Sequence, residues 1–354
     1  MSYLSKLGLW ARNLLFLPIW TLQLFSGAKS FADNPIIGSA ILNRRGLHIR
    51  RLLIAHRLAA MRRRWLSSLV DPQDRQAFDR DGILVKRNFV EADGFARLLA
   101  EVKAFRGPAR ETLQGSTVTR RIALDPMTLT KLPAVSKLLE TPAFQGIMRY
   151  VGTFDIEPMF YLQTILTHAR SGPPDPQLML HADTFQPTVK AWLFLSDVEA
   201  QGAPFMFVPG SHLPTAARLA WEKQMSVAVS NSGERLSRRG SFRIDAAKLP
   251  ALGLPPARIV DVPANTLVVA DTFGFHARGA SAGPSLRVEI WAYGRYSPYV
   301  PWTSSILWRV RWIARQRTNL FWWWGDRLEK IGLKRNVWRL RAETSAFDET
   351  TDIS

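Results

Sequence analysis

Between residues 159 and 294 the sequence alternates short apolar runs with clusters of turn-forming residues. The runs at 159–167, 188–197 and 286–294 are rich in β-branched and aromatic residues, and a turn cluster, SGPPDP, follows the first of them. Runs of this length are typical of strands and too short for most helices. Further strands are expected at 82–90, 199–212, 257–262 and 266–271. The pattern predicts a mostly β core, and its many turns favour an antiparallel barrel or jelly roll over a wound parallel sheet.

Helices are expected to flank this core. Asp71 followed by Pro72 is a helix-start signal, and a second helix is expected from Glu91 onward. Residues 213–256 are polar and interrupted by Gly and Pro, so we interpret them as an insertion or lid. The core domain is therefore placed at residues 71–298.

Positive charge and tryptophan are concentrated at the two ends of the chain. The net charge is +18, and residues 1–65 hold 11 Lys/Arg against a single acidic residue, while residues 295–341 hold 11 against two. Ten of the 13 tryptophans lie in the same two regions. Basic residues mixed with amphipathic aromatics are typical of a membrane–water interface. We therefore separate a membrane-interface segment at 1–70 and a basic, Trp-rich amphipathic segment at 299–341 from an acidic tail at 342–354.

The apolar run at residues 7–25 is nearly long enough to cross a bilayer, which takes about 20 residues. Arg12, Asn13, Pro18 and Gln23 interrupt it, so a helix lying in the interface is favoured over a spanning one. A cleaved signal peptide and a hairpin packed on the core are the alternatives. Residues 40–69 read as a basic amphipathic helix or as a solvated helix face.

The charge distribution also bears on the classes of partner. A nucleic-acid-binding protein is one interpretation of a pI near 10.8. The core, however, carries almost no net charge, whereas phosphate-backbone binding usually places Lys and Arg on it. We therefore expect anionic membrane lipids, and no nucleic acid, as partners. The chain has no cysteine, which excludes thiolate chemistry and disulfides, so any metal must bind to His, Asp or Glu.

Three polar residues of the core carry a specific chemistry. His181 and Asp183 are two residues apart, a spacing that places both side chains on one face of an extended strand. His276 closes a later strand-like segment, and Arg287 follows on the next. Two histidines and one carboxylate are the ligands of non-haem Fe(II) oxygenases, and they leave open metal positions for a 2-oxo acid and O2. The guanidinium of Arg287 suits the far carboxylate of 2-oxoglutarate.

The sequence also contains FDRDGILVKRNF at residue 78 and WLFLSDVEAQGAPFMFVPGSH, which ends at His212. Together and in this order, these segments and residues resemble the phytanoyl-CoA dioxygenase-like family of Fe(II)/2-oxoglutarate oxygenases. The resemblance covers Phe78 to Tyr296. It implies a double-stranded β-helix, with His181, Asp183 and His276 as iron ligands and Arg287 as the 2-oxoglutarate anchor. The sequence departs from the family two residues after the distal histidine, where Arg278 replaces a small hydroxyl residue and is expected to supplement or replace a co-substrate contact.

Other polar residues are candidates for the same pocket or for the surface. Trp192 lies on a strand face opposite a wholly apolar one and is expected either to line the cavity or to pack in the core. Gln163 and Arg121 are candidate contacts for the 2-oxo acid or the substrate, and structural hydrogen bonding is the alternative. His48 and His56 are expected at the surface or at an interface.

The sequence thus predicts an Fe(II)-, 2-oxoglutarate- and O2-dependent dioxygenase, most simply a hydroxylase. Its ends predict a peripheral protein on the cytoplasmic face of the inner or plasma membrane, with a lipid or lipid-linked substrate. A soluble small-metabolite hydroxylase of the same family is the first alternative. A nucleic-acid-binding or non-catalytic jelly-roll protein is the second.

Overall fold

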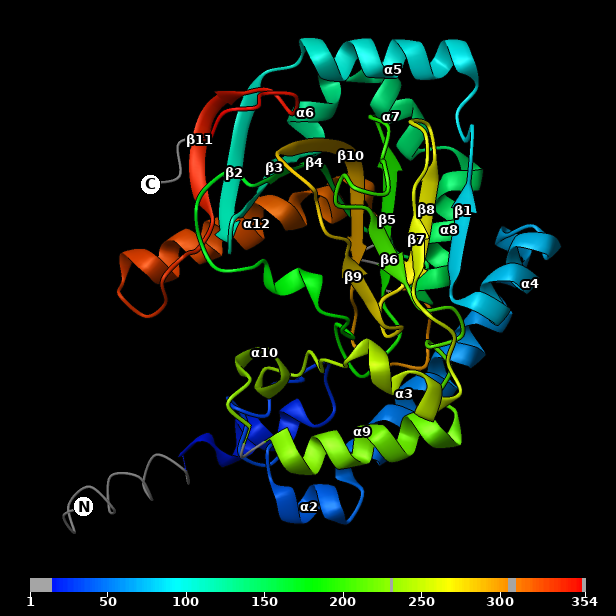
Figure 1. Cartoon of the computed structure of the whole chain (residues 1–354), viewed down its shortest axis with the longest axis vertical. Helices are drawn as coiled ribbons and strands as arrows, with labels where there is room; N and C mark the ends of the chain where they lie inside the picture. Colours follow the sequence, from blue (N-terminus) through cyan, green and yellow to red (C-terminus); the bar gives the residue numbers. More distant parts are fainter. Residues whose placement is uncertain (1–14, 230–231, 305–309, 352–354) are drawn as a thin grey trace.

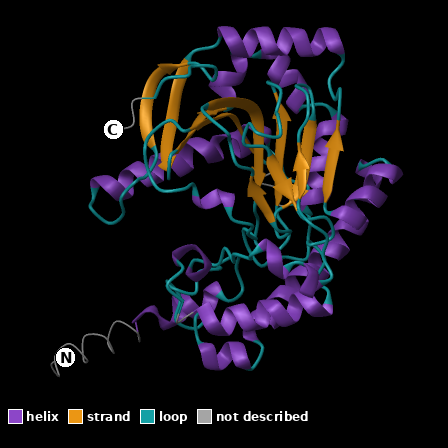
Figure 2. Ribbon diagram, in the orientation of Figure 1, coloured by secondary structure: helices purple, strands orange, loops and turns teal. Residues whose placement is uncertain are grey.

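The strands of the computed structural model, which describes residues 15–229, 232–304 and 310–351, form two sheets (Figures 1 and 2). The larger sheet holds, in spatial order, β1 (Ile83–Lys86), β8 (Leu267–Asp271), β5 (Val189–Phe194), β10 (Ser285–Gly294), β4 (Met159–Thr167), β3 (Thr117–Ala123), β2 (Gly107–Gln114) and β11 (Arg339–Thr344). The smaller sheet holds β7 (Arg258–Val260), β6 (Phe205–Phe207) and β9 (His276–Arg278). All neighbouring strands are antiparallel, so the core is jelly-roll-like, and each expected strand segment contains a strand.

The residues of β5 show how the larger sheet separates two environments. Val189, Ala191 and Leu193 pack into a core that also contains the helices. Trp192 and Phe194 point to the opposite face and pack with residues of β6 and β7. Because successive side chains of a strand alternate between its faces, one face is wholly apolar while the other is free to carry polar chemistry between the two sheets.

Helices cover the outer face of the larger sheet (Figure 1). They are α4 (Pro72–Asp81), α5 (Ala92–Ala104), α6 (Pro126–Thr130), α7 (Pro133–Leu139) and α8 (Pro142–Gly152). The expected start of α4 is confirmed, since the Asp71 side chain accepts a hydrogen bond from the Gln73 amide and Pro72 occupies the first turn.

The basic N-terminal helix packs on the core. It is divided into α2 (Ala40–Arg44) and α3 (Leu47–Trp65), and Leu52 and Ala55 of α3 pack with Phe185 and Phe273. The expectation that His48 and His56 lie at the surface or at an interface is wrong for His48, which is buried, while His56 is half-buried. His48 Nε2 lies 2.8 Å from a carboxylate oxygen of Glu222, and the His56 ring packs edge-on against Phe273 at 4.4 Å between centroids.

Arginine explains how so basic a helix is buried. Arg62 is 1% exposed, and its guanidinium donates to the backbone carbonyls of Thr153 and Pro298. It also lies 4.2 Å from the ring centroid of Phe154. Carbonyl oxygens and an aromatic face can satisfy a guanidinium that has no carboxylate partner, so a basic composition did not mean a solvated helix face.

The segment at 213–256 packs on the N-terminal helices. It contains α9 (Ala216–Ala228) and α10 (Arg235–Arg238), and α9 contacts both α2 and α3. A buried ion pair between Arg218 and Glu222, with an N···O distance of 3.0 Å, lies inside this packing.

The C-terminal segment extends the core sheet past residue 298. Its helix α12 (Arg311–Lys330) contacts β4 and α6, and β11 pairs with β2. Several large apolar side chains of α12 are more than half exposed: Trp312, Leu320, Phe321, Trp323 and Trp324.

Residues 15–23 are helical and also expose apolar side chains, among them Leu15 and Leu22. The first part of the run at 7–25 lies outside the described residues. Within the described part of the chain, no helix has the length and apolar character needed to cross a membrane.

Candidate metal centre and co-substrate pocket

Backbone pairing brings the two histidines together. The His181 amide donates to the His276 carbonyl at 2.9 Å, and the His276 amide donates back at 3.0 Å, which places the ring centroids 4.4 Å apart. The Asp183 amide donates to the carbonyl of Thr272. His181 forms only an isolated bridge and Asp183 lies in a bend, so the expected extended strand is not what aligns them. Instead, backbone hydrogen bonds to β9 and to the residues before β9 align His181 and Asp183.

The hydrogen bonds of both imidazoles fix their orientation. Nδ1 of His181 lies 2.8 Å from the Met179 carbonyl, and Nδ1 of His276 lies 2.9 Å from the Gly274 carbonyl. Because a carbonyl only accepts, each Nδ1 carries the proton and each Nε2 keeps its lone pair. The two Nε2 atoms lie 3.8 and 3.7 Å from Oδ1 of Asp183.

This donor set fits a divalent metal. One potential ligand atom from each of the three residues lies within 4.8 Å of the others, and the buried Nε2 of His276 has no hydrogen-bond partner among the described residues. A buried unpaired nitrogen is costly unless a ligand satisfies it. Two imidazoles and one carboxylate are the ligands that non-haem iron oxygenases use.

Charge and burial keep these three side chains in the protonation states that bind a metal. Burial lowers the pKa of His276 to about 4 and the pKa of His181 well below its usual range, so both imidazoles are neutral near pH 7. Burial would raise the pKa of Asp183, but the neighbouring charges, led by the Lys190 ammonium 2.5 Å from Oδ2, bring it well below its usual range. Metal binding therefore requires no proton loss from these groups.

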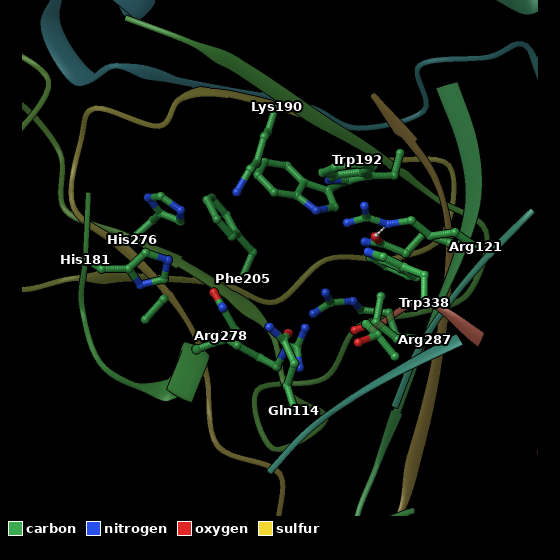
Figure 3. Close-up of a pocket in the computed structure, with 16 residues that line it drawn as sticks. Gln114, Arg121, His181, Lys190, Trp192, Phe205, His276, Arg278, Arg287 and Trp338 are labelled. Atoms are coloured by element: carbon green, nitrogen blue, oxygen red, sulfur yellow. Dashed lines mark hydrogen bonds between the residues drawn. The ribbon is translucent and has the colours of Figure 1, made fainter. Parts of the chain in front are cut away.

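A cavity of about 210 Å³ leads away from the histidines (Figure 3). Sequence-predicted residues that line it are His181, His276, Arg287, Arg278, Gln163, Trp192 and Arg121. Asp183 completes the group beside the two histidines. The structure thus brings all eight predicted residues to one place. Lining residues that sequence reasoning missed include Gln114, Lys190, Phe205 and Trp338.

Strand register places a chain of hydrogen bonds across the cavity wall. Arg121 of β3 is opposite Gln163 of β4, which is opposite Glu289 of β10. Arg121 Nε donates to the Gln163 side-chain oxygen at 2.8 Å, and Gln163 Nε2 donates to Glu289 at 2.6 Å. Arg287 Nε donates to the other Glu289 oxygen at 2.9 Å. Glu289, which sequence reasoning missed, shares the strand face of Arg287 two residues away.

The arginines of this pocket differ in how far their charges are compensated. Arg287 pairs with Glu289 and also donates to the Ala203 carbonyl, while Arg278 pairs with Asp175.

Arg121 has no ion-pair partner among the described residues. Its guanidinium lies 3.9 Å from the ring centroid of Trp291 and 4.8 Å from that of Trp338. Burial lowers its pKa to about 10, so it stays cationic. The end of the pocket away from the histidines therefore carries net positive charge.

Part of the chain is similar to one protein family and to several solved structures. The family model described as phytanoyl-CoA dioxygenase (PhyH) matches residues 78–228, which include His181 and Asp183. The solved structure of SnoN, a non-heme alpha ketoglutarate dependent epimerase from nogalamycin biosynthesis, is 20% identical, with 64% of this chain and 82% of that chain covered and a TM-score of 0.43. HygX from Streptomyces hygroscopicus, solved with nickel and 2-oxoglutarate, is 17% identical, with 65% and 87% covered and a TM-score of 0.38. No curated protein matches.

Proposed function

We propose that this chain, which is phytanoyl-CoA dioxygenase-like over residues 78–228, hydroxylates a membrane lipid or lipid-linked substrate at the cytoplasmic face of a membrane. The observation that carries the enzymatic part is the buried His181, Asp183 and His276 cluster at the mouth of a cationic cavity. Iron bound there, with 2-oxoglutarate and O2, supplies the oxidation of a C–H bond coupled to decarboxylation of 2-oxoglutarate to succinate.

Individual residues of the chain would bind the metal, bind 2-oxoglutarate and exclude water. The two Nε2 atoms and the Asp183 carboxylate would hold the metal and leave its other positions open. Arg287 would bind the far carboxylate of 2-oxoglutarate, with Arg121 and Arg278 adding positive charge. Trp192 and Phe205, whose ring centroids lie 4.3 Å apart, form an apolar wall that excludes water.

The membrane part of the proposal rests on the exposed surface of both ends. Residues 15–23 and α12 extend toward the same side of the molecule in Figure 1, and both expose large apolar side chains. Trp338, which follows α12, lines the cavity, so the C-terminal segment contributes to the cavity as well as to the exposed surface. Basic residues near anionic lipid add about 1 kcal/mol each, and their excess favours the cytoplasmic side.

The size of the cavity limits how a lipid could bind. At about 210 Å³ it is small for a complete lipid together with 2-oxoglutarate. Only the reacting part of the substrate would enter, while its chains stay in the membrane. The same size also fits a small metabolite, so a soluble small-metabolite hydroxylase is the second candidate.

Flotation with liposomes tests the membrane proposal. We expect full-length protein to float with anionic liposomes, and the combined change of Leu22, Trp323 and Trp324 to serine to weaken binding at least tenfold. Each buried side chain of this size contributes about 1.5–3 kcal/mol. Changing the exposed Leu213 and Ile259 to serine removes apolar surface elsewhere and should leave binding intact. Wild-type protein that ignores the liposomes would favour the small-metabolite hydroxylase instead.

A further inference from the structure

Part of the N-terminal segment lies directly against the metal centre. The Lys29 ammonium donates to the backbone carbonyl of Asp183, and Arg295, just after β10, donates to the carbonyl of Gly27. The guanidinium of Arg51 holds three further carbonyls in residues 24–28. The chain that follows the helix at 15–23 is thus fixed beside Asp183.

Around this contact, cationic side chains outnumber the carboxylates that neutralise them. Lys190 reaches the Asp183 carboxylate, and Arg295 adds its charge to those of Lys29 and Lys190. Arg243 is also near, but Glu234 and Asp175 offset its charge. Burial, together with these cations, lowers the pKa of Lys29 to about 8 in spite of Asp183. Within the described ranges, no carboxylate forms an ion pair with Lys29 or Arg295. The nearby carboxylate of Asp183 would be a ligand of the metal.

These cations are separate from the proposed 2-oxoglutarate anchor. Lys190 of β5 is opposite Tyr293 of β10, and Arg295 lies two residues beyond. Arg287 is six residues before Tyr293 on the same strand, which corresponds to roughly 20 Å of extended chain. Lys190 lines the same cavity as Arg287, but Lys29 and Arg295 do not line it. A 2-oxoglutarate molecule that reaches from the metal to Arg287 therefore leaves Lys29 and Arg295 available to a different anion.

We propose that Lys29, Lys190 and Arg295 bind a phosphate group of the substrate beside the metal centre, an inference that rests on the proposed function. Two ammonium groups and a guanidinium match a phosphate ester in charge and in hydrogen-bond donors. Lys29 lies six residues after the helix at 15–23. A headgroup phosphate of a membrane lipid is therefore the source that the position of Lys29 favours.

Isothermal titration calorimetry on full-length protein tests this site, with Mn(II) and 2-oxoglutarate bound to prevent turnover. The ligands are dihexanoyl phosphatidic acid, the uncharged dihexanoylglycerol and glycerol 3-phosphate. We expect phosphatidic acid to bind at least tenfold more tightly than dihexanoylglycerol. The double variant Lys29→Gln/Arg295→Gln keeps donors for the Asp183 and Gly27 carbonyls but removes two charges, and it should lose this preference. The matched double variant Arg97→Gln/Lys103→Gln removes two exposed charges of α5, at the opposite end of the molecule from the N-terminal segment (Figure 1), and should retain it.

The outcomes separate the two proposals. If wild-type protein binds Mn(II) and 2-oxoglutarate but shows no preference for phosphatidic acid, or if the double variant keeps that preference, the phosphate site is wrong while the oxygenase stands. If wild-type protein binds neither Mn(II) nor 2-oxoglutarate, the proposed function fails. Glycerol 3-phosphate that binds as tightly as phosphatidic acid would overturn the lipid source and point to a soluble phosphate ester.

Discussion

His276→Ala is expected to abolish 2-oxoglutarate turnover, and His181→Ala and Asp183→Ala are expected to do the same. Each removes one of three ligand groups that converge within 4.8 Å, and a metal site with three protein ligands tolerates no such loss. Succinate formation by purified protein with Fe(II) measures the effect. Wild-type protein should also bind about one Fe(II) per chain, and each variant should bind less.

His168→Ala is the matched control, because His168 is exposed and does not line the cavity at the metal centre. It should retain wild-type turnover. Wild-type rates of succinate formation in any two of the three ligand variants would show that the metal does not bind at this cluster.

Arg287→Ala is expected to lower the apparent affinity for 2-oxoglutarate at least tenfold while Fe(II) stays bound. A hydrogen bond to a charged group contributes about 1.5–3 kcal/mol, and the change also leaves the buried Glu289 without its cation. Anaerobic titration of the Fe(II)-loaded protein with 2-oxoglutarate measures the affinity.

Arg287→Lys separates the two causes. Lysine keeps a charge near Glu289 but lacks the planar fork, so the affinity should remain reduced. If Arg287→Ala leaves the affinity unchanged and Arg121→Ala or Arg278→Ala lowers it, the anchor is one of the other arginines of the cavity.

Local patterns were enough to predict much of the sheet. In β5 the alternation of Val189, Ala191 and Leu193 with Lys190 and Trp192 fixes which face meets the helices. The placement of Trp192 in the cavity follows from that period of two. β4 begins and ends where its apolar run does. For β4 and β5, the residues of the strand itself are enough to predict the strand.

Other elements depend on partners far along the chain, so no local pattern could predict them. β2 and β3 carry Arg110, Glu111 and Arg120, and each of these buried charges has a partner. Arg120 pairs with Glu111 on the neighbouring strand and donates to the Ser345 carbonyl near the C-terminus, and Arg110 pairs with Asp326 of α12. The buried position of His48 depends on Glu222, 174 residues away. A composition rule that places charged residues at the surface fails when such partners exist.

The residues of the site also differ in whether the sequence alone could identify them. His181, Asp183 and His276 carry a recognisable ligand chemistry in their residue types. Trp338 and Lys29 reach the site from segments that composition set apart as ends, because β11 joins the sheet and residues 24–31 pack beside Asp183. Sequence reasoning favoured a membrane surface for those ends and gave packing of the N-terminal run on the core only as an alternative.

Incubation with isotopically heavy dioxygen tests the central proposal most directly. Purified protein is supplied with Fe(II), 2-oxoglutarate and a membrane lipid extract, and mass spectrometry follows the heavy oxygen. We predict one labelled atom in succinate and one in a lipid, with both lost in His276→Ala. The absence of label from succinate in the wild-type reaction, with Fe(II) and 2-oxoglutarate bound, would contradict the assignment as a 2-oxoglutarate-dependent oxygenase.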